Sequence, residues 1–241
     1  MHNRGFSLIE CIISILLSSW LCSLIIQHMH IAQYSTHKNY QVISLGYDKA
    51  MLSDLLRESI QQAGFTPCRT LTYLSHTQRL QTIKLERTQQ PKLHISRMED
   101  NYASILEILS PTHLRITNSS SFLRQDHVLI ADCAHAEKNQ IIGMRHFSHY
   151  TDIHLQNPLQ FDYLSPTFIG KWRTETFSLS DDQQGNQTFY YQVNDAHPEV
   201  LSKNISAWQI KTSLIPPSQI ITILFTMRDN LSWDLQSIIR A

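Results

Sequence analysis

A run of 21 residues near the start of the chain, from Phe6 to Ile26, contains one charged side chain, Glu10. At about 1.5 Å of rise per residue, an α-helix of this length spans the hydrocarbon core of a bilayer. Arg4 precedes the run, and positive charge beside a membrane helix tends to stay on the cytoplasmic side. We therefore predict a transmembrane helix over residues 6–26, with the rest of the chain on the far side of the membrane.

Two details separate this run from a cleavable secretory signal peptide. Such a signal has a shorter apolar region followed by a small-residue cleavage site, whereas here the small residue Gly5 comes first. Glu10 is also costly, because an acid inside a membrane helix costs about 2.5 to 3.5 kcal/mol and calls for a cationic partner. Cleavage after Gly5 would create one, since the new amino group on Phe6 lies four residues before Glu10 and could also face Glu10 of a neighbouring copy.

The segment RGFSLIE at positions 4–10 resembles the class III signal of type IV prepilins and of type II secretion pseudopilins. The resemblance implies cleavage after Gly5 by a prepilin peptidase, N-methylation of Phe6 and a role for Glu10 in assembly. It also implies a single-pass inner-membrane protein whose periplasmic C-terminal domain later joins a pilus filament at the cell surface. The alternative is an uncleaved signal anchor in which the glycine and the acid are accidental.

The chain beyond the apolar run is predicted to stay helical as far as Gly64, because no proline or cluster of turn residues interrupts it. Apolar residues recur there at the spacing of one helix face, which predicts an amphipathic segment packed on a globular domain; they are Leu45, Leu52, Leu56, Ile60 and Ala63. We thus expect a leader at residues 1–5, a transmembrane half-helix at 6–26, an amphipathic half-helix at 27–64 and a β-rich globular domain at 65–241.

An antiparallel sheet is predicted for residues 65–241, since short runs of β-branched and aromatic residues alternate there with turn residues. A hairpin is expected around Gly185-Asn186, a loop at Asn118 to Ser121, and a break between two late strands at Pro216-Pro217. The fold class is therefore α+β, and the resemblance makes it pilin-like. The predicted strands are 70–74, 82–86, 92–96, 128–131, 141–147, 174–179, 188–193, 207–212 and 220–226.

Three later segments are similar to those of PilW-type minor pilins. The segment AGFTPC at 63–68 resembles their A-G-aromatic-x-x-C element, DHVLIADC at 126–133 resembles their strand ending in cysteine, and Tyr190-Tyr191 to Trp208 resembles their late strands. The resemblance implies a structural, non-enzymatic subunit that helps initiate pilus assembly or forms the pilus tip. Its partners would be the prepilin peptidase, other minor pilins, the major pilin and the assembly platform in the inner membrane. Pseudopilin J of type II secretion is the alternative.

The four cysteines divide into two pairs. Cys68 and Cys133 would lie in an oxidising compartment if the domain is exported, and two thiols in one such domain usually pair. We predict a disulfide between them, with two unpaired buried cysteines as the alternative. Within the apolar run, small residues share one helix face, which either helps helices to pack closely in lipid or merely reflects how common small residues are there; they are Cys11, Ser14, Ser18 and Cys22.

Other chemistry finds little support in the sequence. The 20 basic and 20 acidic side chains balance, so bulk charge does not indicate nucleic acid as a partner. Neither a nucleophile elbow nor a phosphate-binding glycine loop is present, and the acid pairs Glu99-Asp100 and Asp181-Asp182 do not continue as calcium loops. A membrane-tethered enzyme or metal-binding protein is the alternative from another class. We expect no metal or cofactor, because the spacing of the candidate ligands does not match a zinc site; they are Asp132, Cys133, His135, His146, His149 and His154.

Overall fold

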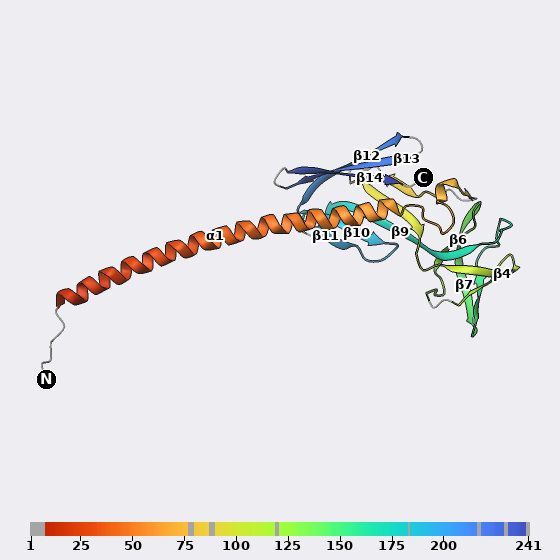
Figure 1. The fold of residues 1–241 in the computed structure, drawn as a ribbon, viewed down its shortest axis with the longest axis horizontal. Coiled ribbons are helices and arrows are strands. Elements are labelled where there is room, and N and C mark those ends of the chain that lie inside the picture. Colours follow the sequence, from red (N-terminus) through yellow and green to blue (C-terminus); the bar gives the residue numbers. More distant parts are fainter. Residues whose placement is uncertain are drawn as a thin grey trace. The chain divides into compact units, whose positions relative to one another are not determined.

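The structure is a computed structural model that describes residues 8–76, 80–86, 90–118, 121–182, 184–215, 218–228 and 231–239. The chain divides into two units, residues 1–50 and residues 51–241. Helix α1 (Leu8–Gln61) begins in the first unit and ends in the second, and all the strands belong to the second (Figure 1). The strands are β1 (Ser75–His76), β2 (Ile83–Glu86), β3 (Lys92–Met98), β4 (Ala103–Ser110), β5 (His113–Thr117), β6 (His127–Ala131), β7 (His135–His146), β8 (Tyr150–Leu155), β9 (Phe168–Asp181), β10 (Gln187–Val193), β11 (Glu199–Ser202), β12 (Ile205–Ile215), β13 (Ser218–Met227) and β14 (Ser232–Ile239).

The first unit is a helix whose described side chains are exposed, apart from the half-buried Leu45 and Asp48. By length and composition, this helix is apolar enough to cross a membrane. The long apolar N-terminal helix predicted from the sequence is therefore present. Its predicted start at Phe6 lies outside the described residues.

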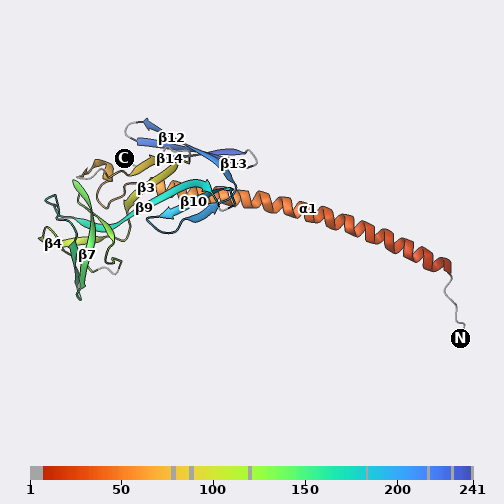
Figure 2. The ribbon, with the colours of Figure 1, turned by 180° about the vertical axis from the view of Figure 1, so that it is seen from behind.

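In the second unit, the last turns of α1 are buried. Leu52, Leu56 and Ile60 are at most 1% exposed, as their helical spacing predicted. They pack between the sheet of β12, β13 and β14 and the layer that contains β3, β9 and β10 (Figure 1 and Figure 2). The helix ends at Gln61, slightly before the predicted end at Gly64, and Gly64 has a φ of 69°, a left-handed conformation typical of residues just beyond a helix.

The strands form two sheets, which makes the layout α+β as predicted. The larger contains eleven of the described strands, and its path runs β1-β7-β8-β5-β4-β9-β10-β11, while the smaller has the order β12-β13-β14. Among the described residues only β1 and β7 pair in parallel. Strand β9 is the central element, since it pairs with β4 and β6 near its start and with β3 and β10 further along.

Around this strand lie three apolar clusters. One surrounds the end of α1 and includes Phe177, Phe189 and Trp208. A second lies among β4 to β9 and includes Leu114, Ile130 and Ile153. A third, smaller cluster includes Met98, Leu129 and Trp172 and lies beside the loop that follows α1. The second unit thus builds its apolar core from both halves of β9.

Most predicted strands are found, but their limits differ and several strands were not predicted. The prediction for 70–74 is wrong, because Leu71–Tyr73 is a 3-10 helix and only the short β1 follows it. Strands β4, β5, β8, β11 and β14 were not predicted. The hairpin of β9 and β10 is confirmed, with Gly185 at a φ of 76° in its loop. Pro216, Pro217 and the middle two residues of the predicted loop at 118–121 lie outside the described residues.

Candidate functional site

The processing residues predicted from the sequence, Gly5 and Phe6, lie outside the described residues, but Glu10 is described and lies in the first turn of α1. Its side chain is exposed, like the apolar side chains around it. The hydroxyl of Ser14 donates a hydrogen bond to the Glu10 backbone oxygen at 2.8 Å, and that of Ser18 to the Ser14 backbone oxygen at 2.7 Å. These hydroxyls are satisfied within the helix, so they add little cost to placing it in lipid.

The small residues on this helix remain available for packing against another helix. Cys11 and Cys22 are unpaired and exposed. Together with Ser14 and Ser18, they form a row of small residues along one helix face, which would allow close approach of a second helix in a membrane.

The disulfide predicted from the sequence is present between Cys68 and Cys133, whose Cα atoms are 5.2 Å apart. It joins the loop after α1 to the turn between β6 and β7. The Ser75 N–H donates to the Ala134 carbonyl at 2.8 Å beside it, so backbone pairing and a covalent bond hold the same two segments together. With 65 positions between the cysteines, the loss of unfolded-state entropy stabilises the domain by about 4 kcal/mol in the chain-entropy model.

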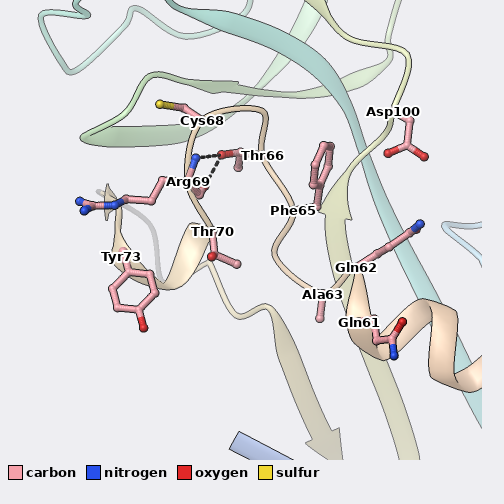
Figure 3. Close-up of a pocket in the computed structure, with 10 residues that line it drawn as sticks. All are labelled: Gln61, Gln62, Ala63, Phe65, Thr66, Cys68, Arg69, Thr70, Tyr73 and Asp100. Carbon is pink, nitrogen blue, oxygen red and sulfur yellow. Dashed lines mark hydrogen bonds between the residues drawn. The ribbon is translucent and has the colours of Figure 1, made fainter. Parts of the chain in front are cut away.

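A hollow of about 700 Å³ lies beside this loop, between the end of α1 and Tyr73 (Figure 3). Amide, hydroxyl and phenol groups line it, with Arg69 and Asp100 as its charged residues. Thr66 and Arg69 hold the loop in shape, because the Thr66 hydroxyl donates to the Arg69 carbonyl and the Arg69 N–H points back to that hydroxyl at 3.4 Å. Among the described residues of its lining there is no histidine or free thiol.

Asp132, one of the candidate metal ligands, serves the backbone instead. Its buried carboxylate accepts N–H groups from Ala134 at 2.7 Å, His135 at 2.5 Å and Leu164 at 3.0 Å. Burial alone would raise the pKa of Asp132, but these donors outweigh it and lower the pKa overall. The carboxylate therefore fixes the turn that carries Cys133 and ties it to the loop around Leu164.

The candidate histidines lie in different surroundings. The His135 ring stacks on Phe161 with centroids 4.7 Å apart, and His146 shares a hydrogen bond of 3.1 Å with Thr151. His154 stacks on His113 at 4.1 Å, a neighbour that sequence spacing did not indicate. Within the described ranges, no group of three or more His, Cys, Asp or Glu side chains is arranged to hold a metal ion.

Of the acid pairs Glu99-Asp100 and Asp181-Asp182, the second has hydrogen-bond partners nearby in sequence. The Asp182 side chain accepts N–H groups from Gln184 and Asn186, both at 2.8 Å, and these bonds lower the pKa of Asp182. It thereby shapes the loop of the β9–β10 hairpin. Asp100 lies at the rim of the hollow beside α1. Neither pair is part of a metal-binding group among the residues that the structure describes.

Sequence reasoning missed several buried titratable groups, and Glu137 is one of them. Glu137 on β7 is 4% exposed and accepts the Gln160 N–H at 3.0 Å. Burial raises the pKa of Glu137, with a smaller opposing effect from that N–H, and burial likewise raises the pKa of Tyr163 nearby. No local pattern predicts this arrangement, because the loop that covers Glu137 lies more than twenty positions further along the chain.

Comparisons with protein-family models, with curated proteins and with solved structures found no match. The function therefore has to be argued from the residues and their geometry. The features available are an apolar helix with an acid in its first turn, a disulfide-linked β-rich unit, and two polar hollows on that unit.

Proposed function

We propose that this chain is a minor type IV pilin of the PilW kind, a structural and non-catalytic subunit that helps to initiate pilus assembly or forms the pilus tip. The subunit is held in the inner membrane by residues 6–26, with its C-terminal domain in the periplasm, until it enters the filament. A prepilin peptidase would process it, and other minor pilins, the major pilin and the inner-membrane assembly platform would be its partners.

One observation carries the proposal. The segment RGFSLIE at positions 4–10 leads directly into a helix with exposed apolar side chains, and the acid of that segment lies in the first turn of the helix. An acid at this place is costly in lipid unless a cation accompanies it. Cleavage after Gly5 would create an amine four residues before Glu10, and this amine would supply the cation that the acid needs.

The mechanism follows from the chemistry of this segment. Burial of the apolar helix in the bilayer stores the subunit in the membrane. Cleavage after Gly5 exposes the amino group of Phe6, which is then methylated. The carboxylate of Glu10 pairs with the Phe6 amine of a neighbouring subunit, which sets the register of the helices as the subunit leaves the membrane. The disulfide and the apolar core keep the C-terminal domain folded during this transfer.

The proposal is tested by expressing the full chain with a prepilin peptidase and an assembling pilus system. Mass spectrometry should show loss of the first five residues and a methyl group on Phe6. Gly5→Leu should abolish cleavage, whereas Asn3→Leu in the leader should not. Glu10→Ala should leave cleavage intact but lower the amount in sheared pili by about tenfold or more, because the lost compensation exceeds about 1.4 kcal/mol.

Ser19→Ala is the matched control for Glu10→Ala, since the Ser19 hydroxyl is exposed and bonded to the Leu16 carbonyl of its own helix at 2.9 Å. It should be incorporated like the unchanged protein. Absence of cleavage by a peptidase that processes another prepilin would contradict the proposal, as would normal incorporation of Glu10→Ala. Normal pili with a loss of protein secretion, on deletion of the chain, would indicate pseudopilin J instead.

A further inference from the structure

A second hollow, of about 520 Å³, lies on the β-rich unit between the outer face of β3, β9 and β10 and the strands β6 and β7. These strands contribute lysines, hydroxyls and side-chain amides to one surface, and β3, β9 and β10 can be followed in Figure 2. No aliphatic side chain belongs to the lining, and its one tryptophan, Trp172, is 9% exposed. We call this hollow the lysine groove, after Lys92, Lys138 and Lys171.

The lining of the lysine groove holds three lysines and two acids, and a third acid, Glu86, lies beside it, opposite Lys92 in the β2–β3 ladder and 3.5 Å from the His94 ring nitrogen. Lys171 is paired with Asp126 at 2.9 Å, and the same carboxylate accepts the Leu123 N–H at 2.8 Å. Asp195 is the other acid of the lining, and it is exposed. Among the described residues, neither Lys92 nor Lys138 has a carboxylate within ion-pair distance. The lining itself therefore carries one more lysine than acid.

Lys138 is the most informative of these residues. It is half-buried, and its ammonium lies 5.8 Å from the centroid of the Trp172 ring. Burial lowers the pKa of Lys138, with a smaller opposing effect from Asp195, so the cation is partly desolvated without a close counter-ion. An anion that enters the groove would recover part of this cost, because charge pairs are stronger where water is partly excluded.

The rest of the lining indicates what would carry the anion. The Thr176 hydroxyl shares a hydrogen bond with the His94 ring at 2.9 Å, the Thr174 hydroxyl shares one with Ser96 at 3.1 Å, and the Gln192 amide donates to the Ala196 carbonyl at 2.9 Å. Each of these side chains keeps a further donor or acceptor position for a ligand. A polyol can meet them in either direction, whereas apolar peptide side chains would find no aliphatic surface here. Lysine also presents a point charge rather than the flat fork of arginine, so it accepts oxyanions of different shape.

We propose that the lysine groove binds a hydroxyl-rich ligand that carries an oxyanion, as an acidic or a phosphorylated sugar does. Lys138 contacts the oxyanion within the groove, while the threonine and glutamine side chains bind the hydroxyls. Lys92 lies several strand positions away along β9 and adds positive charge at the exposed end of the groove. This site is independent of the helix and of the pilin proposal, because every residue of its lining belongs to the β-rich unit.

The test uses the full chain in detergent and isothermal titration calorimetry with glucuronate, glucose 6-phosphate and glucose. We expect saturable binding of one or both anionic sugars at millimolar concentration, and weaker binding or none for glucose. The two anionic probes separate a carboxylate from a phosphate as the preferred group. Lys138→Gln should weaken binding about tenfold or more, because a charge-assisted hydrogen bond is lost.

Lys211→Gln, an exposed lysine on β12 away from the groove, is the matched control and should bind like the unchanged protein. Lys92→Gln should weaken binding less than Lys138→Gln, because Lys92 lies further along the groove, and its exposed position makes it a usable variant if Lys138→Gln fails to fold. The proposal is overturned if neither anionic sugar binds, if glucose binds as tightly as they do, or if the groove variants match Lys211→Gln.

Discussion

Two stretches of helix α1 differ in how far their leucine side chains are buried. Leu16, in the first unit, is 63% exposed, and Leu56, in the second, is fully buried. Both are leucines in regular α-helix, so neither helical propensity nor residue type separates them. What differs is the surrounding structure, because strands from two sheets cover Leu56, whereas none of the described residues covers the apolar side chains around Leu16.

This contrast defines what each stretch requires from its environment. Contiguous exposed apolar surface is rare on soluble monomers and marks a surface that lipid or another protein covers. The first unit exposes large apolar side chains on all its faces, including Leu16, Leu17 and Trp20. Its stability therefore depends on a membrane or on neighbouring helices, while the second unit supplies its own core.

The sharpest way to break this comparison is to remove the same side chain from each stretch. Leu56→Ala should lower the free energy of unfolding of the second unit by about 2 to 5 kcal/mol, because it leaves a cavity in a packed core. Leu16→Ala in detergent should change that free energy by less than about 0.5 kcal/mol. Urea unfolding followed by tryptophan fluorescence measures both variants, and equal effects would show that the comparison is mistaken.

The next test concerns the buried carboxylate of Asp132, which is stabilised in the second unit by hydrogen bonds. Asp132→Asn should cost about 1 to 3 kcal/mol at neutral pH, because it removes the charge that three N–H groups and the His135 ring stabilise. The pKa of Asp132 is lowered in the folded state, so its contribution is complete above the unfolded pKa and is lost as pH falls through the folded pKa.

The pH dependence of unfolding therefore checks this prediction. The unchanged protein should lose stability below about pH 4, and the difference between it and Asp132→Asn should shrink over the same range. Asp234→Asn, at an exposed position on β14, is the control and should leave stability at neutral pH unchanged. A gap between Asp132→Asn and the unchanged protein that stays constant down to pH 2 would count against a role for the ionised carboxylate.

The smallest expected effects come from two glycines at different places on and after α1. Gly46 lies inside the exposed helix, with no atom within 4 Å of an added Cβ, so Gly46→Ala should stabilise that stretch by about 0.5 to 1 kcal/mol. Gly64 has positive φ, and an added Cβ would lie 2.5 Å from the Thr82 methyl group, so Gly64→Ala should destabilise by about 1 kcal/mol or more.

Circular dichroism in detergent reports the first change as a rise in helicity, and urea unfolding reports the second as a fall in midpoint. The two substitutions should change stability in opposite directions, because Gly46 has open space around it and Gly64 is packed against other elements. Two effects of the same sign would contradict this expectation.

Sequence predicted the elements whose signals are local. The helix was expected from its apolar run and from the spacing of Leu52, Leu56 and Ile60, and the β9–β10 hairpin from its glycine turn. Strand β4 was missed because register shifts after Ile105 and Ile108 break the alternation, leaving Leu106 and Leu109 exposed. The strand predicted at 70–74 was wrong because Leu71–Tyr73 is a 3-10 turn, whose first N–H donates to the Gly64 carbonyl at 2.8 Å, a contact that the composition of the segment does not encode.

The functional and structural sites follow the same rule, because the sequence predicted only those with a local signal. The cysteine pair was named from compartment chemistry and resemblance, and the structure joins it. The structural role of Asp132 and the lysine groove were not foreseen, since Lys92, Lys138 and Lys171 are far apart in sequence and only strand pairing brings them to one surface. Side chains that gather across a sheet leave no local signal, because each is surrounded in sequence by residues of the opposite face.

Strand β9 makes the β-rich unit cooperative. Its first residues form ladders with β6, and its later residues form ladders with β3 and β10, so one continuous backbone segment belongs to both larger apolar clusters. An opening that detaches β9 from either cluster strains its hydrogen bonds in the other. We therefore expect the stabilities of the two clusters to be linked. A destabilising substitution in one cluster should speed amide hydrogen exchange in both.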